Sequence, residues 1–152
     1  MIAVDTNILV YAHRQDSIFH DSAARLMRGL AEGTANWAVP WPCVHEFLAI
    51  VTRRSIWADP TPSARAVDQI SAWLGAPTAR TIAETDQHLA VLADLLLLGQ
   101  ITGAKVHDAR VAALCISHGV RELWTADRDF SRFPQVRARN PLIDGSDQPL
   151  VT

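Results

Sequence analysis

The chain has 152 residues, of which 49% are hydrophobic and 20% charged, and its net charge at pH 7 is −2. This length suits one globular domain with a sizeable core, and the composition excludes a disordered or fibrous chain. The slightly acidic balance argues against a protein that holds nucleic acid through a basic surface alone, because phosphate neutralisation dominates such binding. An enzyme that uses metal cations is compatible with it.

Cysteine usage and the apolar runs indicate where the protein works. Cys43 and Cys115 stand far apart in apolar surroundings, as expected of buried free thiols in a reducing compartment. The N-terminus carries an acid at position 5 and no basic segment, so no secretory signal is predicted. The longest apolar run, 89–98, is interrupted by Asp94 and is too short to span a bilayer. We therefore expect a soluble, cytoplasmic protein.

Short apolar runs alternate along the chain with longer segments of helical periodicity. Strands are expected at 2–4, 36–39, 78–82, 122–125 and 136–138. Helices are expected at 20–32, 42–54, 61–74, 86–98 and 105–118, with Thr85 as the cap of the fourth. This alternation predicts an α/β domain with a largely parallel sheet over 1–143, followed by a flexible tail at 144–152.

Four acidic residues stand at places where such a sheet collects its chemistry. Asp5 directly follows the first strand and Asp127 follows the strand at 122–125, so both lie at carboxyl ends of strands, where the ligand crevice of a parallel sheet opens. Glu46 lies early in an apolar helix, and Asp108 opens a helix of small residues. Taken singly, each has an ordinary structural explanation as a helix cap, a turn residue, a solvated side chain or a partner of the helix dipole.

Taken together, the four acids predict a cation site. If they converge, like charges a few ångströms apart repel by several kcal/mol at an effective dielectric constant of about 20, unless a cation neutralises them. Carboxylate oxygens without soft ligands suit Mg²⁺ or Mn²⁺. The chemistry that such a site supports is phosphodiester hydrolysis, since the metal lowers the pKa of an attacking water and stabilises the leaving oxygen.

Zinc is disfavoured although His45 and His107 directly precede Glu46 and Asp108. Adjacent helix residues point about 100° apart, so neither pair is suited to bind one metal ion together. The HExxH pattern of zinc hydrolases is also absent from the sequence. We expect both histidines to support or pack around the site.

Four segments in order along the chain resemble the PIN domains, in particular the VapC-type ribonuclease toxins of bacterial type II toxin–antitoxin systems. They read IAVDTNILVY, PCVHEFLAIVTR, KVHDARVAALC and LWTADRDFSRF, each centred on one of the four acids. The similarity runs from Met1 to about Ile143, nearly the whole chain. It implies a PIN-like, three-layer α/β/α fold with a central, mainly parallel sheet.

The resemblance also implies a function and a site. The expected protein is a Mg²⁺- or Mn²⁺-dependent endoribonuclease, a homodimer that cleaves RNA as a toxin and is neutralised by a cognate antitoxin, with no membrane partner. Carried over by position, the catalytic and metal-binding residues are Asp5, Glu46, Asp108 and Asp127, with Asp129 as a further metal ligand and Thr6, Asn7 and Thr125 as supporting residues.

Three other functions are open on the sequence alone. One is a housekeeping RNA-processing nuclease with the same PIN fold. Another is a phosphatase of the haloacid-dehalogenase kind with Asp5 as nucleophile, although that family has a second acid two residues on, where this chain has Asn7. The third is an interaction module in which the acids bind a structural metal.

Three further residues near the motifs have no assigned role. Arg110, two residues after Asp108, can either touch the site or pair with an acid. Trp41 and Trp57 flank the Glu46 helix in proline-bearing segments, where partner packing is favoured over the stacking of RNA bases.

Overall fold

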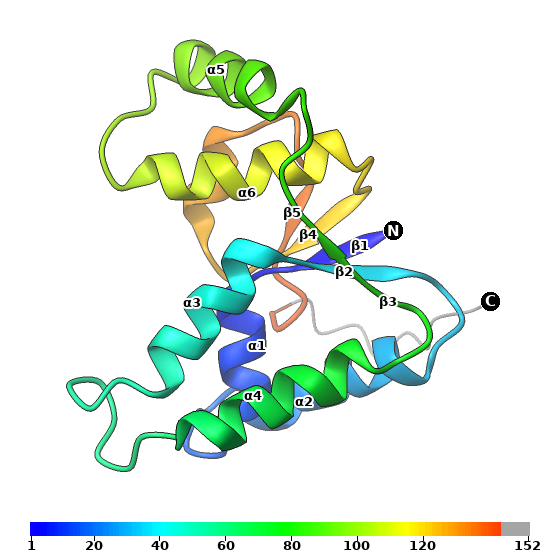
Figure 1. The fold of residues 1–152 in the computed structure, drawn as a ribbon, viewed down its shortest axis with the longest axis vertical. Coiled ribbons are helices and arrows are strands. Elements are labelled where there is room, and N and C mark those ends of the chain that lie inside the picture. Colours follow the sequence, from blue (N-terminus) through cyan, green and yellow to red (C-terminus); the bar gives the residue numbers. More distant parts are fainter. Residues whose placement is uncertain (144–152) are drawn as a thin grey trace.

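The computed structural model describes residues 1–143, and the tail expected at 144–152 lies outside the described residues. Within them, five strands form one parallel sheet in the order β3-β2-β1-β4-β5 (Figure 1). The strands are β1 (Ile2–Val4), β2 (Trp37–Pro40), β3 (Ala79–Ile82), β4 (Glu122–Trp124) and β5 (Ala138–Arg139). The first strand of the chain thus lies at the centre of the sheet, with β4 beside it.

Helices cover both faces of this sheet. They are α1 (Thr6–His13), α2 (His20–Glu32), α3 (Trp41–Val51), α4 (Ser63–Leu74), α5 (His88–Gly99), α6 (Lys105–Ser117) and the 3₁₀ helix η1 (Arg128–Arg132). Figure 1 shows α5 and α6 on one side of the sheet and α1, α2 and α4 on the other. The predicted three-layer α/β/α fold with a central parallel sheet is confirmed.

The apolar pattern of the chain explains these layers. Val4, Val39 and Leu123 of the central strands are almost completely buried, as expected of parallel strands that are covered on both faces. In α2, Ala23, Met27 and Leu30 are buried at helical spacing, so this helix turns one apolar face to the core.

The segment that carries Glu46 differs from its prediction at both ends. Pro40 is the last residue of β2, and α3 begins at Trp41, with Pro42 in the first turn where its missing N–H has no intrahelical partner to lose. The helix ends at Val51 rather than at position 54. The Val51 carbonyl oxygen accepts a hydrogen bond from the backbone N–H of Thr61 at 2.8 Å, so the chain leaves the helix there.

Two other boundary predictions are wrong. Helix α5 begins at His88, and Thr85 does not cap it with its hydroxyl; instead, its carbonyl oxygen accepts from the His88 N–H at 2.9 Å. The last strand pairs with β4 through the carbonyl oxygens of Arg137 and Arg139, which places β5 at 138–139 rather than at 136–138.

Both cysteines, Cys43 and Cys115, are buried free thiols, as predicted. Among residues 1–143, no helix has the length and apolar character needed to cross a membrane.

Candidate active site

Asp5 stands at the junction of β1 and α1 and is the most enclosed of the four acids. Its side chain, 6% exposed, caps α1 by accepting a hydrogen bond from the Thr6 N–H at 2.8 Å. Its other oxygen accepts from the Thr125 hydroxyl at 2.7 Å and from the Asn7 amide at 3.0 Å. Burial raises the pKa of Asp5, while the bond from Thr125 opposes that rise. The carboxyl group is thus fixed in position but poorly solvated.

Asn7 and Thr125 join the ends of the two central strands. The Asn7 side-chain oxygen accepts from the Ala126 N–H at 2.9 Å, and its amide nitrogen lies 3.2 Å from the Thr125 hydroxyl oxygen. That hydroxyl oxygen also accepts from the Asp127 N–H at 3.0 Å. The geometry therefore ties the segment that carries Asp127 to the segment that carries Asp5.

Glu46 reaches the same place from α3. Its carboxylate accepts a hydrogen bond from the Thr6 hydroxyl at 2.7 Å. One turn earlier, the Cys43 thiol lies 3.4 Å from a carboxylate oxygen of Asp5, within donating distance for sulfur. Burial raises the pKa of Cys43 well above its usual range, so this group remains a protonated donor. Helix α3 therefore contacts both Asp5 and Thr6.

The remaining acids form a tight group beside a lysine. Single carboxylate oxygens of Asp108, Asp127 and Asp129 lie within 4.8 Å of one another. The Lys105 ammonium lies 3.7 Å from Asp108 and forms an ion pair with Asp129. Burial raises the pKa of Asp108, and the charge of Asp127 raises it further, whereas Lys105 lowers it.

Asp127 has a structural role as well. Its side chain accepts from the Asp129 N–H at 2.8 Å and so caps η1, the role that a turn residue would have. Asp127 therefore both caps a helix, as its ordinary structural explanation predicted, and converges with the other acids. The same is true of Asp5.

One cavity brings the four predicted acids together. Its volume is about 300 Å³, and Asp5, Glu46, Asp108 and Asp127 all line it. A second hollow of about 600 Å³ shares the same four acids and adds Lys105 and the two histidines of the motifs. The convergence expected from the sequence is confirmed, and Asp129 joins the group through Asp127.

Sequence reasoning missed Lys105 and the contact of Cys43 with Asp5. The signal for Lys105 was present, because residues three apart on a helix are neighbours and Lys105 precedes Asp108 by three positions. The contact from Cys43 needed the fold, since only the packing of α3 against α1 brings it to Asp5.

The residues without an assigned role are placed by the structure. Arg110 pairs with Glu84 at 2.6 Å between Nε and Oε1, so it holds an acid outside the four. The Trp57 ring lies 4.1 Å from the Arg14 guanidinium carbon and lines the 300 Å³ cavity. Trp41, partly exposed, packs against His45.

A parallel sheet with acids gathered at the carboxyl ends of its central strands is the architecture of a known class. The PIN domain model matches residues 2–136, and the chain belongs to the PIN domain family. Among curated proteins, it is 32% identical over 142 residues to VapC ribonuclease Mb2897 of Mycobacterium bovis, covering 93% of this chain and 96% of that protein. Ribonuclease VapC37 of Mycobacterium tuberculosis is 31% identical, with 93% and 97% covered.

Solved structures agree on the fold. VapBC2 from Rickettsia felis, bound to a DNA fragment from its promoter, superposes with a TM-score of 0.65 at 20% identity, covering 91% of this chain and 98% of that chain. Mycobacterium tuberculosis VapC20, described as a toxin that cleaves the sarcin-ricin loop, gives a TM-score of 0.64 at 20% identity, with 86% and 93% covered. Membership of this family leaves the haloacid-dehalogenase alternative without support.

Proposed function

We propose that this chain is a metal-dependent endoribonuclease that acts as the toxin of a toxin–antitoxin pair, with residues 1–143 as its nuclease domain. The observation that carries the proposal is the meeting of Asp5, Glu46, Asp108 and Asp127 in one cavity. The curated relatives, at 31–32% identity over more than nine tenths of the chain, are named ribonucleases. A fold match alone would not support an activity, whereas a fold match with this acidic set does.

The acids fit a hard divalent cation. The donor set is carboxylate oxygens, three of which lie within 4.8 Å of one another, and burial together with the repulsion from Asp127 raises the pKa of Asp108. We assign Asp108, Asp127 and Asp129, together with Asp5 and Glu46, as the residues that hold Mg²⁺ or Mn²⁺. When bound, the ion activates a water and stabilises the leaving oxygen of the phosphodiester.

The chain's own groups orient the site. Thr125 and the Thr6 N–H fix both oxygens of Asp5, so this carboxylate keeps one rotamer whether or not substrate is present. The Thr6 hydroxyl holds Glu46 in the same way. Lys105 adds a positive charge at the edge of the acid group, where it reduces the repulsion on an approaching phosphate.

We propose a cognate antitoxin as the protein partner in the cytoplasm. Solved neighbours include complexes named VapBC2 and FitAB, both bound to DNA fragments. An acidic cavity is also complementary to an arginine guanidinium, which binds carboxylates with two parallel hydrogen bonds. We further propose a homodimer, because three exposed leucines of α5, Leu89, Leu97 and Leu98, leave apolar surface of the kind that subunit interfaces cover.

The experiment is cleavage of a labelled mixed RNA pool by the purified protein. Because oxygen ligands suit hard cations, EDTA should abolish cleavage, and either Mg²⁺ or Mn²⁺ in excess should restore it. The Asp68→Asn variant, which changes an exposed acid of α4, should behave like the unmodified protein and serves as the control. Full cleavage in EDTA would contradict a metal-dependent site.

A further inference from the structure

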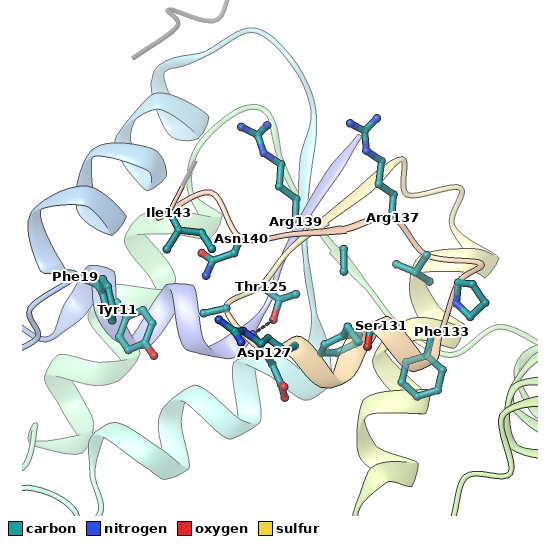
Figure 2. A pocket seen from close by; sticks show the side chains of 16 residues that line it. Tyr11, Phe19, Thr125, Asp127, Ser131, Phe133, Arg137, Arg139, Asn140 and Ile143 are labelled. Carbon is teal, nitrogen blue, oxygen red and sulfur yellow. Dashed lines mark hydrogen bonds between the residues drawn. The ribbon is translucent and has the colours of Figure 1, made fainter. Parts of the chain in front are cut away.

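A third hollow, of about 800 Å³, lies beside the acid site and is drawn in Figure 2. It runs from α1 to the segment between η1 and the end of β5. We call it the β5 groove and define it by Tyr11, Phe19, Asp127, Arg128, Arg137 and Arg139. Tyr11 and Asp127 also line the 300 Å³ cavity of the four acids, so the two spaces are direct neighbours with part of their walls in common. A ligand held at the acids can extend directly into the groove.

The charge of the β5 groove is opposite to that of the acid site. Its charged lining residues are three arginines, Arg128, Arg137 and Arg139, against the single acid Asp127. The Arg137 side chain is 73% exposed and that of Arg139 is 40% exposed. A chain whose net charge is −2 therefore concentrates positive charge beside its acidic cavity.

A buried acid holds two of these arginines on the edge strand. Glu122, 9% exposed, lies 3.4 Å from the Arg137 guanidinium and 3.6 Å from that of Arg139. The Trp124 indole N–H donates to the same carboxylate at 2.9 Å. Arg137 directly precedes β5 and Arg139 ends it; residues two apart in extended chain face the same side, and Figure 2 shows the two arginines side by side. Glu122 thus holds the two guanidinium groups next to each other.

The other end of the groove is aromatic. The rings of Tyr11 and Phe19 lie 5.1 Å apart between centroids, both are half-buried, and both line the groove. Single-stranded RNA is bound by this combination, in which arginines neutralise backbone phosphates and aromatic rings stack on unpaired bases. An acidic peptide would also meet the arginines, but the position of the groove directly beside a proposed site for phosphodiester cleavage favours RNA.

We propose that the β5 groove holds the single-stranded RNA on one flank of the cleaved phosphate, with Arg137 and Arg139 on backbone phosphates and Tyr11 and Phe19 stacking on a base. This inference rests on the proposed function and adds the direction in which the substrate leaves the acids. The proposal implies that the substrate is an extended, unpaired RNA segment rather than a short oligonucleotide, because the groove binds only nucleotides beyond the cleaved bond.

The test is binding of a fluorescent 12-nucleotide single-stranded RNA, measured by anisotropy in EDTA so that the strand remains intact. The variant is Arg137→Gln with Arg139→Gln. The charge-matched control is Arg65→Gln with Arg80→Gln, of which Arg80 lies on β3, the opposite edge strand. We expect the Kd of the first variant to rise about tenfold and its slope of log Kd against log salt to fall by about 1.4, or about 0.7 for each phosphate. The control should change neither quantity.

Loss of both arginines leaves the buried Glu122 without the cations that it pairs with, and this change could affect folding. The single substitution Arg137→Gln is therefore a second variant, since Arg137 is the more exposed of the two side chains. It should weaken binding about threefold and lower the slope by about 0.7. Two longer RNAs, extended by four nucleotides on either the 5′ or the 3′ side, identify the flank. The extension that lies in the groove should tighten binding to the unmodified protein but not to the variant, whereas the other extension should affect both proteins equally. Equal Kd and equal slope in the variant and the control would overturn the proposal. Metal-dependent cleavage is scored separately, so failure of the nuclease function is distinguishable.

Discussion

At the scale of single residues, the ionised Asp108 side chain lowers the stability of the metal-free protein. Burial and the charge of Asp127 raise the pKa of its carboxyl group in the folded protein. Because the pKa of Asp108 is higher in the folded than in the unfolded protein, its neutral carboxyl group contributes to the free energy of unfolding. This contribution is fully present below the unfolded-state pKa and is lost as the pH rises through the folded-state pKa. The metal-free protein therefore carries an unfavourable charge at neutral pH.

The Asp108→Asn variant should release this cost. In EDTA at pH 7, its Tm should exceed that of the unmodified protein by about 2–4 °C, the shift expected for about 1 kcal/mol in a chain of this length. The Tm difference should shrink as the pH falls toward about 4, where the unmodified carboxyl group is also becoming neutral. Differential scanning calorimetry at several pH values checks both points, and a difference independent of pH would contradict the explanation.

Lys105 is the cation that the metal-free site already holds. Its ammonium pairs with Asp108 and Asp129, the acids assigned to the metal, so lysine and metal compete for the same carboxylates. The Lys105→Met variant should bind Mn²⁺ about three to ten times more tightly, because an opposing positive charge near the surface is removed. Isothermal titration measures the affinity, with Lys105→Arg as the charge-keeping control. Weaker Mn²⁺ binding by Lys105→Met would show that the lysine supports the metal instead.

At the scale of elements, the site depends on the junction between β1 and β4. The Thr125 hydroxyl donates to Asp5 and accepts from the Asp127 N–H, so one side chain connects the carboxyl ends of neighbouring strands. Each bond alone is ordinary, but both Thr125 and Asp5 are buried, and a buried polar group that loses its partner costs about 1–3 kcal/mol.

The Thr125→Val variant tests this junction with a side chain of the same shape. We expect its Tm to fall by about 2–12 °C, from the loss above and the shift of roughly 2–4 °C for each kcal/mol. RNA cleavage should fall further than stability explains, because Asp5 loses its fixed rotamer. Thr52→Val is the matched control, since the Thr52 hydroxyl bonds a carbonyl of its own helix, away from the acids. An unchanged rate in Thr125→Val would show that Asp5 is positioned without this bond.

Element prediction succeeded where a local pattern determined the outcome and failed where a distant contact did. Alternating apolar runs and helical periodicity placed the strands and the helices that carry Glu46 and Asp108. The end of α3 could not be read locally, because the Val51 carbonyl is taken by Thr61, ten residues on. The start of α5 was misplaced for a different, local reason: the Thr85 carbonyl closes a turn with the His88 N–H, and the Thr85 hydroxyl does not cap the helix.

At the scale of the whole molecule, the candidate site was largely predictable because parallel topology constrains it. Strand ends that are remote in sequence meet at one edge of the sheet, so Asp5 and Asp127 had to approach each other once β1 and β4 were neighbours. The arginines of the β5 groove were not predictable in this way. Their position depends on Glu122, a strand residue whose burial no local pattern indicated.

The Asp5→Asn variant tests most directly whether the four converging acids form a metal-dependent catalytic centre. Asparagine caps helices as well as aspartate does, so the bond from the Thr6 N–H to the side chain can be kept while the charge is lost. With Mg²⁺ present, the variant should cleave the RNA pool at least about 100 times more slowly than the unmodified protein, while its circular dichroism spectrum is unchanged and Asp68→Asn keeps full activity. Cleavage by a folded Asp5→Asn variant at the unmodified rate would contradict the account.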